Sequence, residues 1–446
     1  MLVLLLVLMT GCLLVLQGRS ENRRYDRRIS LSTPRGYAYE LLPVPPRGMY
    51  GDGMTKLNRI VVVGASLAGL RAVQALRAAD FAGDITLIGA EDHAPYNRPP
   101  LSKSVLDGDD DITLPGAEQL DDDWLRNRRA TALRTDERLV VLDDGSEIAF
   151  DGLIVATGAS PRRFDAQPAG VHSLRTVDDA LALRTELAAA PGHVTVIGGG
   201  FIGSEVASTA RRQGISVTLV DAGSHPMTAT LGSRGAQWLA RHHERHGVDL
   251  VSGVRAVGFD GESRASAVLL SDGRRIPTDV VVAGTGVEPN TDWMRESGLK
   301  LDNGVVCTSS LFAEGESSIV AAGDVARWSH PLYGGELVRV EHWANANEQG
   351  ALAARNLLAG PAEAETYAAV PSFATHVHGA RIQVAGMPAL ADEERVLLDE
   401  SAEDRLLVAF FSRGILVGAV AVNAPKDLIR LKRAIAARTS SDEVAA

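Results

Sequence analysis

Phosphate binding is the chemistry suggested by two glycine-rich turns, Gly64-x-Ser66-x-x-Gly69 and Gly198-x-Gly200-x-x-Gly203. Each turn follows a short apolar, β-branched run and opens a helix-like run. In such a turn the first glycine permits a tight bend, and a small second residue lets backbone N–H groups approach a pyrophosphate. The last glycine lets the helix pack on the strand. The two turns therefore predict two dinucleotide sites.

Each turn is followed by an acidic residue at the end of the next strand. Glu91 ends the run "DITLIGAE", and Asp221 ends "ISVTLVD". A carboxylate at this place takes the ribose hydroxyls of a dinucleotide. Ser66 replaces the middle glycine of the first turn, but it is small and could donate to phosphate. The segment "DAGSHPM" after the second strand has no arginine, which favours NADH over NADPH.

The elements that must position these residues are two strand–turn–helix–strand units. Their strands are apolar on both faces, as expected of central strands in a parallel sheet. A smaller piece follows from about residue 371, with strand-like runs at 381–386, 405–412 and 415–422 and a helix at 424–438. We therefore expect an α/β protein with two Rossmann-like dinucleotide-binding domains and a small C-terminal α/β domain.

Composition limits the function classes. The chain has 446 residues and a formal net charge of −11, which argues against nucleic acid as a main partner. Its two cysteines, Cys12 and Cys307, form no CxxC pair, so a disulfide scaffold and an internal dithiol relay are excluded. We expect Cys307 to be a small core or surface residue.

The first 53 residues differ from the rest. Residues 1–17 are apolar, basic residues follow them, and residues 18–53 lack periodicity, which predicts disorder. Three interpretations stay open: translation that starts at Met54, which we favour; an anchor that leaves the body in the cytoplasm; or a secreted lipoprotein cleaved at Cys12. Unless the apolar stretch is an anchor, we expect no membrane association and a cytoplasmic protein.

Five further segments carry a resemblance to a known family. They are "APYNRPPLSK" (94–103), "LIVATGASPR" (153–162), "VVAGTGVEPN" (281–290), "IVAAGDVARW" (319–328) and "VEHWANANEQGALAARNLL" (340–358). With both turns, and in this order, they resemble the FAD-dependent pyridine nucleotide-disulfide oxidoreductases. The likeness is greatest to the NADH-dependent ferredoxin, putidaredoxin and rubredoxin reductases of bacterial oxygenase systems. It extends from about residue 57 to the C-terminus.

The resemblance implies a domain division: a leader (1–53), two parts of an FAD domain (54–162 and 285–370), an NAD domain (163–284) and a C-terminal domain (371–446) for dimerisation or acceptor docking. It also implies FAD at the first turn and NADH at the second. The implied cofactor-binding residues are Gly64, Ser66, Leu67, Ala68, Gly69, Glu91, Arg98, Lys103, Ala156, Thr157, Gly158, Gly198, Gly200, Ile202, Gly203, Asp221, Gly286, Gly323, Asp324, His342 and Trp343.

Specific roles follow from the same resemblance. Lys103 would pair with Glu205 near the reactive edge of the flavin, and we take this pair as catalytic. Asp324 would bond the ribityl chain, and Trp343 would lie near the isoalloxazine ring. Plainer interpretations stay open: the pair as solvated surface charges, Trp343 as core, and Asp324 as a helix N-cap.

The implied reaction passes electrons from NADH through FAD to an acceptor. Without a CxxC pair, the resemblance implies a [2Fe–2S] ferredoxin or a rubredoxin-type partner. A homodimer stays open. Basic residues on the C-terminal helix could dock an acidic ferredoxin, although a solvated helix face is an equal alternative. These residues are Lys426, Arg430, Lys432, Arg433 and Arg438.

One segment departs from the family pattern. Related reductases show an "FWSDQY"-like stretch against the flavin, whereas residues 373–378 here read Phe-Ala-Thr-His-Val-His. Ala374 stands where tryptophan is usual, and His376 and His378 replace an aspartate and a tyrosine. We expect a more open flavin face, so an NADH oxidase or quinone-type reductase is an alternative. A redox-responsive interaction protein resembling the apoptosis-inducing flavoproteins is another. A metal site is not expected, because no further ligands cluster nearby.

Overall fold

The computed structural model describes residues 30–32, 38–40, 57–120, 124–165 and 167–444. The chain divides into two compact units, residues 1–49 and 50–446. The described part of the first unit is an antiparallel pair, β1 (Ser30–Ser32) and β2 (Ala38–Glu40). The prediction of disorder over 18–53 is therefore wrong at these strands. The apolar stretch, Cys12 and Met54 lie outside the described residues.

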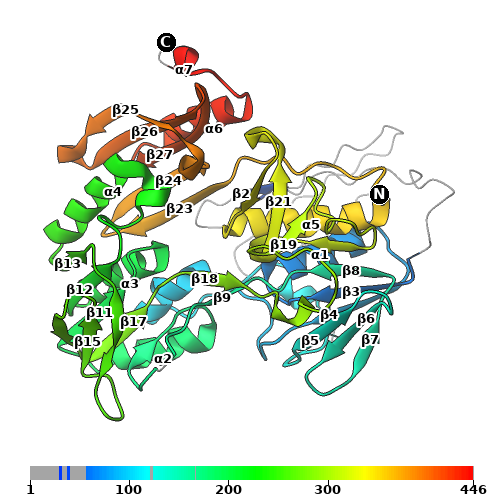
Figure 1. Ribbon diagram of the computed structural model, residues 1–446, viewed down its shortest axis with the longest axis horizontal. Coiled ribbons are helices and arrows are strands. Elements are labelled where there is room, and N and C mark those ends of the chain that lie inside the picture. The colour runs from blue at the N-terminus through cyan, green and yellow to red at the C-terminus, as the bar shows by residue number, and fades with distance from the viewer. Residues whose placement is uncertain (1–29, 33–37, 41–56, 121–123, 166, 445–446) are drawn as a thin grey trace, which may run out of the picture. The chain divides into compact units, whose positions relative to one another are not determined.

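The first dinucleotide fold of the second unit is a four-stranded parallel sheet with the strand order β20-β8-β3-β4. Figure 1 labels three of these strands, β3, β4 and β8. Its strands are β3 (Arg59–Val63), β4 (Asp84–Ile88), β8 (Gly152–Val155) and β20 (Ile319–Ala321). The helices α1 (Leu67–Ala78) and α5 (Trp343–Ala359) pack against each other. Their approach is close, since a Cβ on Gly350 would lie 2.2 Å from the carbonyl oxygen of Ala68. Distant segments thus complete one domain.

The second dinucleotide fold is a five-stranded parallel sheet with the strand order β10-β17-β11-β12-β13. Its strands are β10 (Val171–His172), β11 (His193–Ile197), β12 (Ser216–Asp221), β13 (Val248–Ser252) and β17 (Val280–Ala283). The helices between them are α2 (Val177–Ala188), α3 (Phe201–Arg212) and α4 (Thr228–Arg245). A capping box formed by Thr176 and Asp179 begins α2.

The C-terminal part is a five-stranded antiparallel sheet with the order β23-β24-β27-β26-β25. Its elements are β23 (Ser372–Val377), β24 (Ala380–Gly386), β25 (Glu393–Glu400), β26 (Arg405–Ser412), β27 (Ile415–Val422) and α6 (Pro425–Ala436). The sequence predicted three of these strands and the helix. It missed β23 and β25, whose polar residues hide the pattern of a strand.

Smaller elements complete the second unit. They are β5 (Ala130–Arg134), β6 (Leu139–Leu142), β7 (Glu147–Ala149), β9 (Ala159–Pro161), β14 (Ala256–Asp260), β15 (Ala267–Leu270), β16 (Arg275–Pro277), β18 (Val287–Pro289), β19 (Val305–Cys307), β21 (Ala326–His330), β22 (Glu336–Arg339) and α7 (Ser441–Val444). None of the helices in the described part of the chain has the length and apolar character needed to cross a bilayer.

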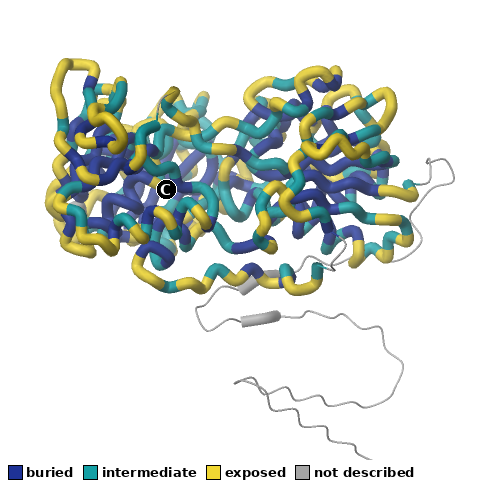
Figure 2. The backbone as a smooth tube through the Cα atoms, turned by 90° about the horizontal axis from the view of Figure 1, so that it is seen from below, coloured by how far each residue is buried: buried dark blue, intermediate teal, exposed yellow. Residues whose placement is uncertain are grey.

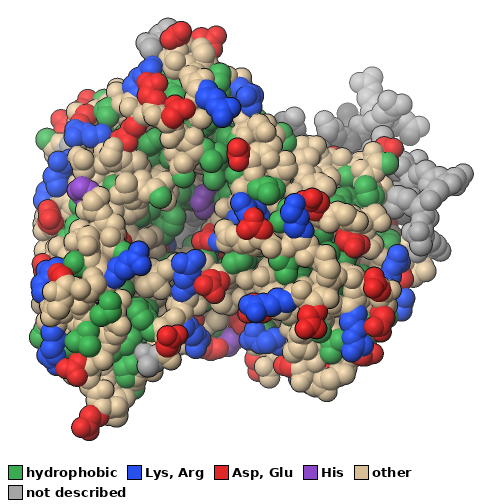
Figure 3. Space-filling model, in the orientation of Figure 1, with side chains coloured by type: hydrophobic (Ala, Val, Ile, Leu, Met, Phe, Trp, Pro, Cys, Tyr) green, Lys and Arg blue, Asp and Glu red, His purple; other side chains and the backbone are tan. Residues whose placement is uncertain are grey.

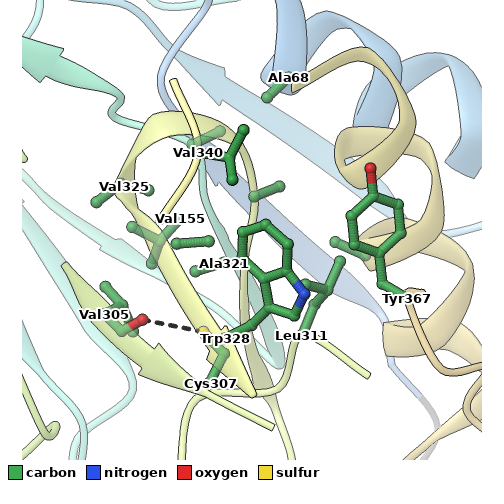
Figure 4. Close-up of a cluster of buried hydrophobic side chains, with 14 of the residues drawn as sticks. Ala68, Val155, Val305, Cys307, Leu311, Ala321, Val325, Trp328, Val340 and Tyr367 are labelled. Atoms are coloured by element: carbon green, nitrogen blue, oxygen red, sulfur yellow. Dashed lines mark hydrogen bonds between the residues drawn. The ribbon is translucent and has the colours of Figure 1, made fainter. Parts of the chain in front are cut away.

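Buried residues follow the central strands, and exposed residues lie mainly on the loops (Figure 2). Cys307 is a core residue beside Trp328, and its Sγ donates to the carbonyl oxygen of Val305 at 3.2 Å (Figure 4). Burial raises the pKa of this thiol to about 12, so it stays protonated and unreactive. The predicted fold class is confirmed, while the exact domain boundaries stay a prediction.

A histidine cluster joins α4 to the turn after β23. His243 Nδ1 lies 3.1 Å from His378 Nε2, and the His246 ring stacks on His378 at 4.5 Å between centroids. Burial, then the neighbouring histidines, lower the pKa of His243 and of His378 to about 3. Both rings are therefore neutral in the folded protein at pH 6.

This cluster predicts a loss of stability in mild acid. Unfolded histidines take up protons below about pH 6.5, whereas the folded rings do so only near pH 3, so stability falls as pH drops through that window. His378→Asn is expected to flatten the fall in Tm between pH 7 and pH 5, because asparagine tolerates the φ of +47° at this position. Thermal unfolding across pH tests this. The matched change at partly exposed His93 should leave the slope close to that of the wild type, because its pair with Asp178 is open to solvent and contributes little. An equal slope in both variants would contradict the prediction.

Candidate functional site: two dinucleotide turns around a buried ion pair

The two glycine turns have the same geometry. Gly64 has φ +115° and a Cβ there would lie 2.1 Å from the carbonyl oxygen of Ala156; Gly198 has φ +95° and the corresponding clash with Gly284 is at 2.3 Å. A Cβ on Gly69 or on Gly203 would lie 1.9 Å from the carbonyl oxygen of the first glycine of its turn. These positions therefore require glycine, for backbone conformation or for close packing.

The middle residue of each turn, Ser66 or Gly200, does not have to be glycine for steric reasons. Ser66 and Gly200 are the N-caps of α1 and α3, and neither supplies a side-chain cap to the helix. A Cβ on Gly200 would meet no atom within 4 Å. The space in front of the α3 N-terminus is thus open to a phosphate, with the first-turn N–H group of Ile202 behind it. At the α1 N-terminus, the corresponding first-turn N–H groups are those of Leu67 and Ala68.

The acid of the first unit is held by two side chains. Arg98 Nη2 donates to Glu91 Oε1 and Tyr96 Oη to Glu91 Oε2, both at 2.5 Å. Arg98 Nε also donates to Ser66 Oγ at 3.2 Å, so it links the acid to the turn. Tyr96 was not predicted as a site residue, although it lies inside the segment "APYNRPPLSK". Its burial raises the pKa of its phenol.

Asp324 lies on the 3₁₀ turn Gly323–Val325, whose N-cap is Ala322. The interpretation of Asp324 as an N-cap is therefore wrong. Its Oδ2 accepts from Arg175 Nη2 at 2.8 Å, and the carbonyl oxygen of Arg175 accepts from Arg98 at 2.7 Å. Arg175 was not predicted as a site residue; a basic residue just before the capping box of α2 was the available signal.

Lys103 and Glu205 meet where the two dinucleotide folds adjoin. Lys103 Nζ lies 2.7 Å from Glu205 Oε2, and the side chain of Glu205 is only 6% exposed. The interpretation of these residues as solvated surface charges is therefore wrong. A carboxylate this deeply buried requires partners for both oxygens. Ser102 Oγ and Thr375 Oγ1 donate to them, and neither residue was predicted to belong to the site.

Three aromatic rings from different segments meet near this pair. Phe373 of β23 packs edge-on to Phe201 of α3, with centroids 4.2 Å apart, and lies 4.6 Å from the His342 ring. Burial lowers the pKa of His342 to about 4, so its ring is neutral. Trp343 begins α5 and packs against an apolar cluster with Leu67. Both the core interpretation and a flavin-side role of Trp343 are compatible with this position.

A cavity of about 570 Å³ lies at the second turn, lined by Gly198, Gly200 and Asp221. The carboxylate of Asp221 accepts from the backbone N–H groups of Gly199 at 2.7 Å and Gly223 at 2.8 Å. Three arginines from other segments also line this cavity: Arg162, Arg163 and Arg255. The lack of arginine in "DAGSHPM" therefore does not describe the whole pocket, because basic residues reach it from other segments of the chain.

The remaining predicted residues flank the two turns. Ala156 and Thr157 follow β8, and Asn290 donates to the carbonyl oxygen of Thr157 at 2.8 Å. Three predicted glycines have positive φ: Gly158, Gly286 and Gly323. The helix residue Ile202 is 40% exposed, which is unusual for isoleucine. An apolar residue beside an open turn suits contact with a bound nucleotide.

Residues 373–378, the segment that departs from the family pattern, extend past the end of β23. Ala374 and His376 are exposed on β23, whereas His378 lies in the following turn. His376 and His378 therefore do not lie on the same strand. Within the described residues, no group of three or more His, Cys, Asp or Glu side chains could hold a metal ion.

The residues present fit two dinucleotides. The nitrogen atoms Arg339 Nε and His342 Nδ1 are buried and lack a hydrogen-bond partner within the described chain, and the guanidinium of Arg339 also donates to the carbonyl oxygen of Asp324. FAD would be held by the first turn, Glu91, Arg98 and Asp324, and NADH by the second turn and Asp221. Bound FAD would supply a group that accepts a hydride and releases electrons singly. The chain supplies placement, charge and shielding from water.

Comparison with protein families supports this architecture. Residues 58–350 match the family described as pyridine nucleotide-disulphide oxidoreductase, and residues 373–446 match the family described as reductase C-terminal. The ferredoxin–NAD(+) reductase component of the biphenyl dioxygenase system of Paraburkholderia xenovorans is 34% identical over 396 residues, or 86% of this chain and 94% of the relative. Rhodocoxin reductase of Rhodococcus erythropolis is 36% identical over 389 residues, or 84% and 89%.

Solved structures give the same result. A ferredoxin reductase from Rhodopseudomonas palustris superposes with a TM-score of 0.80 at 31% identity, covering 86% of this chain and 95% of that one. Putidaredoxin reductase in its covalent complex with putidaredoxin has a TM-score of 0.79 at 30% identity, covering 85% and 93%. With the family match over residues 58–350 and these similarities across most of its length, the chain belongs to the pyridine nucleotide-disulphide oxidoreductase family.

Proposed function

We propose that this chain is an NADH-dependent FAD oxidoreductase that passes electrons to a ferredoxin-type iron–sulfur protein of an oxygenase or cytochrome P450 system. The observation that carries the proposal is the buried Lys103–Glu205 pair between the two dinucleotide turns. A cation held there favours the negative charge that reduction adds to a nearby ring. The similarity to reductase components of dioxygenase and rhodocoxin systems supports the class of acceptor.

The acceptor-docking surface is proposed to be the exposed face of α6. Its basic residues Lys426, Arg430 and Arg433 are exposed, and Ile429 among them is 56% exposed. Within the described chain no carboxylate pairs with these three cations, and Figure 3 shows Lys and Arg side chains gathered over α6. Lys432 Nζ donates to Ser372 Oγ at 2.8 Å, which connects this helix to β23 and the aromatic rings at the site.

Charge reversal on α6 should weaken coupling to the acceptor alone. For Arg430→Glu/Arg433→Glu we expect the KM for an acidic ferredoxin to rise about 10-fold at low salt, because steering by charge is lost. Reduction of ferricyanide by NADH should stay at the wild-type rate. The matched reversal Arg295→Glu/Lys300→Glu, on exposed residues of the first dinucleotide fold, should change neither value. Equal ferredoxin kinetics in both double variants would contradict this docking surface.

Steady-state NADH oxidation by the FAD-loaded protein tests the proposed function. Turnover that needs a [2Fe–2S] ferredoxin and falls with added salt supports a ferredoxin reductase. Equal turnover with oxygen or quinone alone favours the second candidate, an NADH oxidase or quinone-type reductase. The exposed Ala374 favours that candidate, since a bulky side chain is missing there. Slow turnover with every acceptor, with an NADH-dependent change of oligomer state, would favour a redox-responsive interaction protein.

We also propose that the protein body is cytoplasmic. The support is the order of the N-terminal segments, an apolar stretch followed by basic residues, if they are translated.

A homodimer through the C-terminal domain stays a proposal that sedimentation equilibrium can test.

A further inference from the structure

The carboxylate of Glu205 is fixed by donors from two segments outside its own domain. Its Oε2 accepts from Lys103 Nζ and Ser102 Oγ, which follow the "RPP" loop of the FAD domain. Its Oε1 accepts from Thr375 Oγ1 on β23 of the C-terminal sheet. Glu205 itself lies on α3, within the second dinucleotide fold. One buried carboxylate thus connects the three folded parts of the second unit.

Thr375 is suited to hold this carboxylate in one orientation. It is only 2% exposed, although both neighbours on the strand, Ala374 and His376, are exposed. The pleat of β23 therefore turns Thr375 inward between them. Because the two oxygens of Glu205 have separate donors, the carboxylate plane is fixed rather than free to rotate about its terminal bond. A threonine in a strand also has few alternative rotamers, so its hydroxyl is preorganised.

We propose that Thr375 is a positioning residue for reduction of the protein by NADH. Its hydroxyl holds the Glu205 carboxylate, which in turn holds the Lys103 ammonium at the site where the two dinucleotides meet. The inference rests on the proposed function only in needing NADH to reduce bound FAD, and it holds whichever acceptor follows. It also assigns a role to the altered segment 373–378. That segment opens the surface at Ala374 while it keeps one inward hydroxyl.

Loss of the Thr375 hydroxyl is expected to change the position of the Glu205 carboxylate. Without Thr375 Oγ1, one oxygen of a nearly buried carboxylate has no donor. The carboxylate is then free to rotate toward Lys103 and Ser102, whose donors both lie on its other oxygen. This rotation displaces the ammonium from its place in the wild-type protein. The residues proposed to bind NADH do not include Thr375, so NADH binding should be unaffected.

Stopped-flow reduction of the FAD-loaded full chain by NADH, without acceptor, tests the role. For the near-isosteric Thr375→Val we expect the limiting rate to fall about 10-fold, the effect of one missing donor in a buried polar pair. The Kd for NADH should stay unchanged, so the loss should appear in the limiting rate alone. Thr375→Ser keeps a hydroxyl donor at this position and should restore the wild-type limiting rate, which a merely structural role of the side chain would not require.

Thr195→Val is the matched control, because it makes the same change at a buried strand position whose hydroxyl has no partner in the described chain. It should leave the limiting rate and the Kd for NADH as in the wild type. If valine at 375 prevents FAD retention, Thr375→Ala removes the same hydroxyl without crowding. A wild-type limiting rate in the FAD-retaining variant would overturn the inference. Failure of NADH to reduce even the wild-type protein would instead overturn the proposed function.

Discussion

Replacing Lys103 with methionine is expected to lower the limiting rate of reduction by NADH about 100-fold, the usual cost of removing one preorganised charged donor from an active site. The Lys103 ammonium is the cation nearest the Glu205 carboxylate, at 2.7 Å. Methionine keeps the length and apolar stem of lysine but removes the charge, so packing changes little. The carboxylate is left buried with hydroxyl donors only, which is unfavourable for a charge in that environment. Stopped-flow absorbance of bound FAD measures the effect directly.

Two further variants separate charge at the site from charge in general. Lys103→Arg keeps the cation and should retain more activity than methionine, although its planar head does not reproduce the ammonium geometry. Lys300→Met removes a surface lysine that pairs with Glu314 at 3.0 Å, and it should leave the rate unchanged because exposed pairs contribute little. A Lys103→Met protein that NADH reduces at the wild-type rate would contradict any role of the pair in the reaction.

The sequence predicts those parts of the fold whose arrangement depends on residues close together in the chain. The glycine spacing, the β-branched runs and the acids at 91 and 221 lie within single strand–turn–helix–strand units, so their arrangement follows from the chain itself. The strands β26 and β27 were also predicted at their observed bounds, because both are continuously apolar. In contrast, β25 is rich in charged residues at the edge of its sheet and gives no such signal.

The part that could not be predicted depends on contacts between distant segments. Arg175 and Asp324 are 149 positions apart, and Thr375 and Glu205 are 170 apart. No local rule relates such residues; only the closing of the domains brings them together. The same holds for Arg162, Arg163 and Arg255, which reach the cavity beside Asp221 from outside its βαβ unit. Family resemblance supplied Lys103 and Glu205 as a pair, but neither resemblance nor pattern supplied the hydroxyls that hold it.

The same glycine-to-alanine substitution is expected to have different effects in the two turns: loss of FAD binding in the first and loss of NADH binding in the second. Gly69→Ala should yield protein that does not retain FAD, and Gly203→Ala should yield FAD-loaded protein whose Kd for NADH is raised at least about 100-fold. In both variants the new Cβ would lie 1.9 Å from a backbone carbonyl oxygen, so helix and turn must move apart. The cost to folding is about 3 kcal/mol, the upper end for overpacking. Absorbance of purified protein gives FAD content, and NADH titration of FAD-loaded protein gives the Kd.

Gly200→Ala distinguishes loss of a ligand contact from damage to the fold. A Cβ on Gly200 meets nothing within 4 Å, and its φ of −69° suits any residue, so Tm should stay at the wild-type value. Affinity for NADH should nevertheless fall, because the added methyl occupies the open space that a pyrophosphate needs. The first turn already has a side chain at the equivalent position, Ser66, whose Oγ accepts from Arg98 instead of blocking the helix N-terminus. Unchanged NADH affinity in Gly200→Ala would mean that the nucleotide does not approach this turn, and the assignment of the second site would then be wrong.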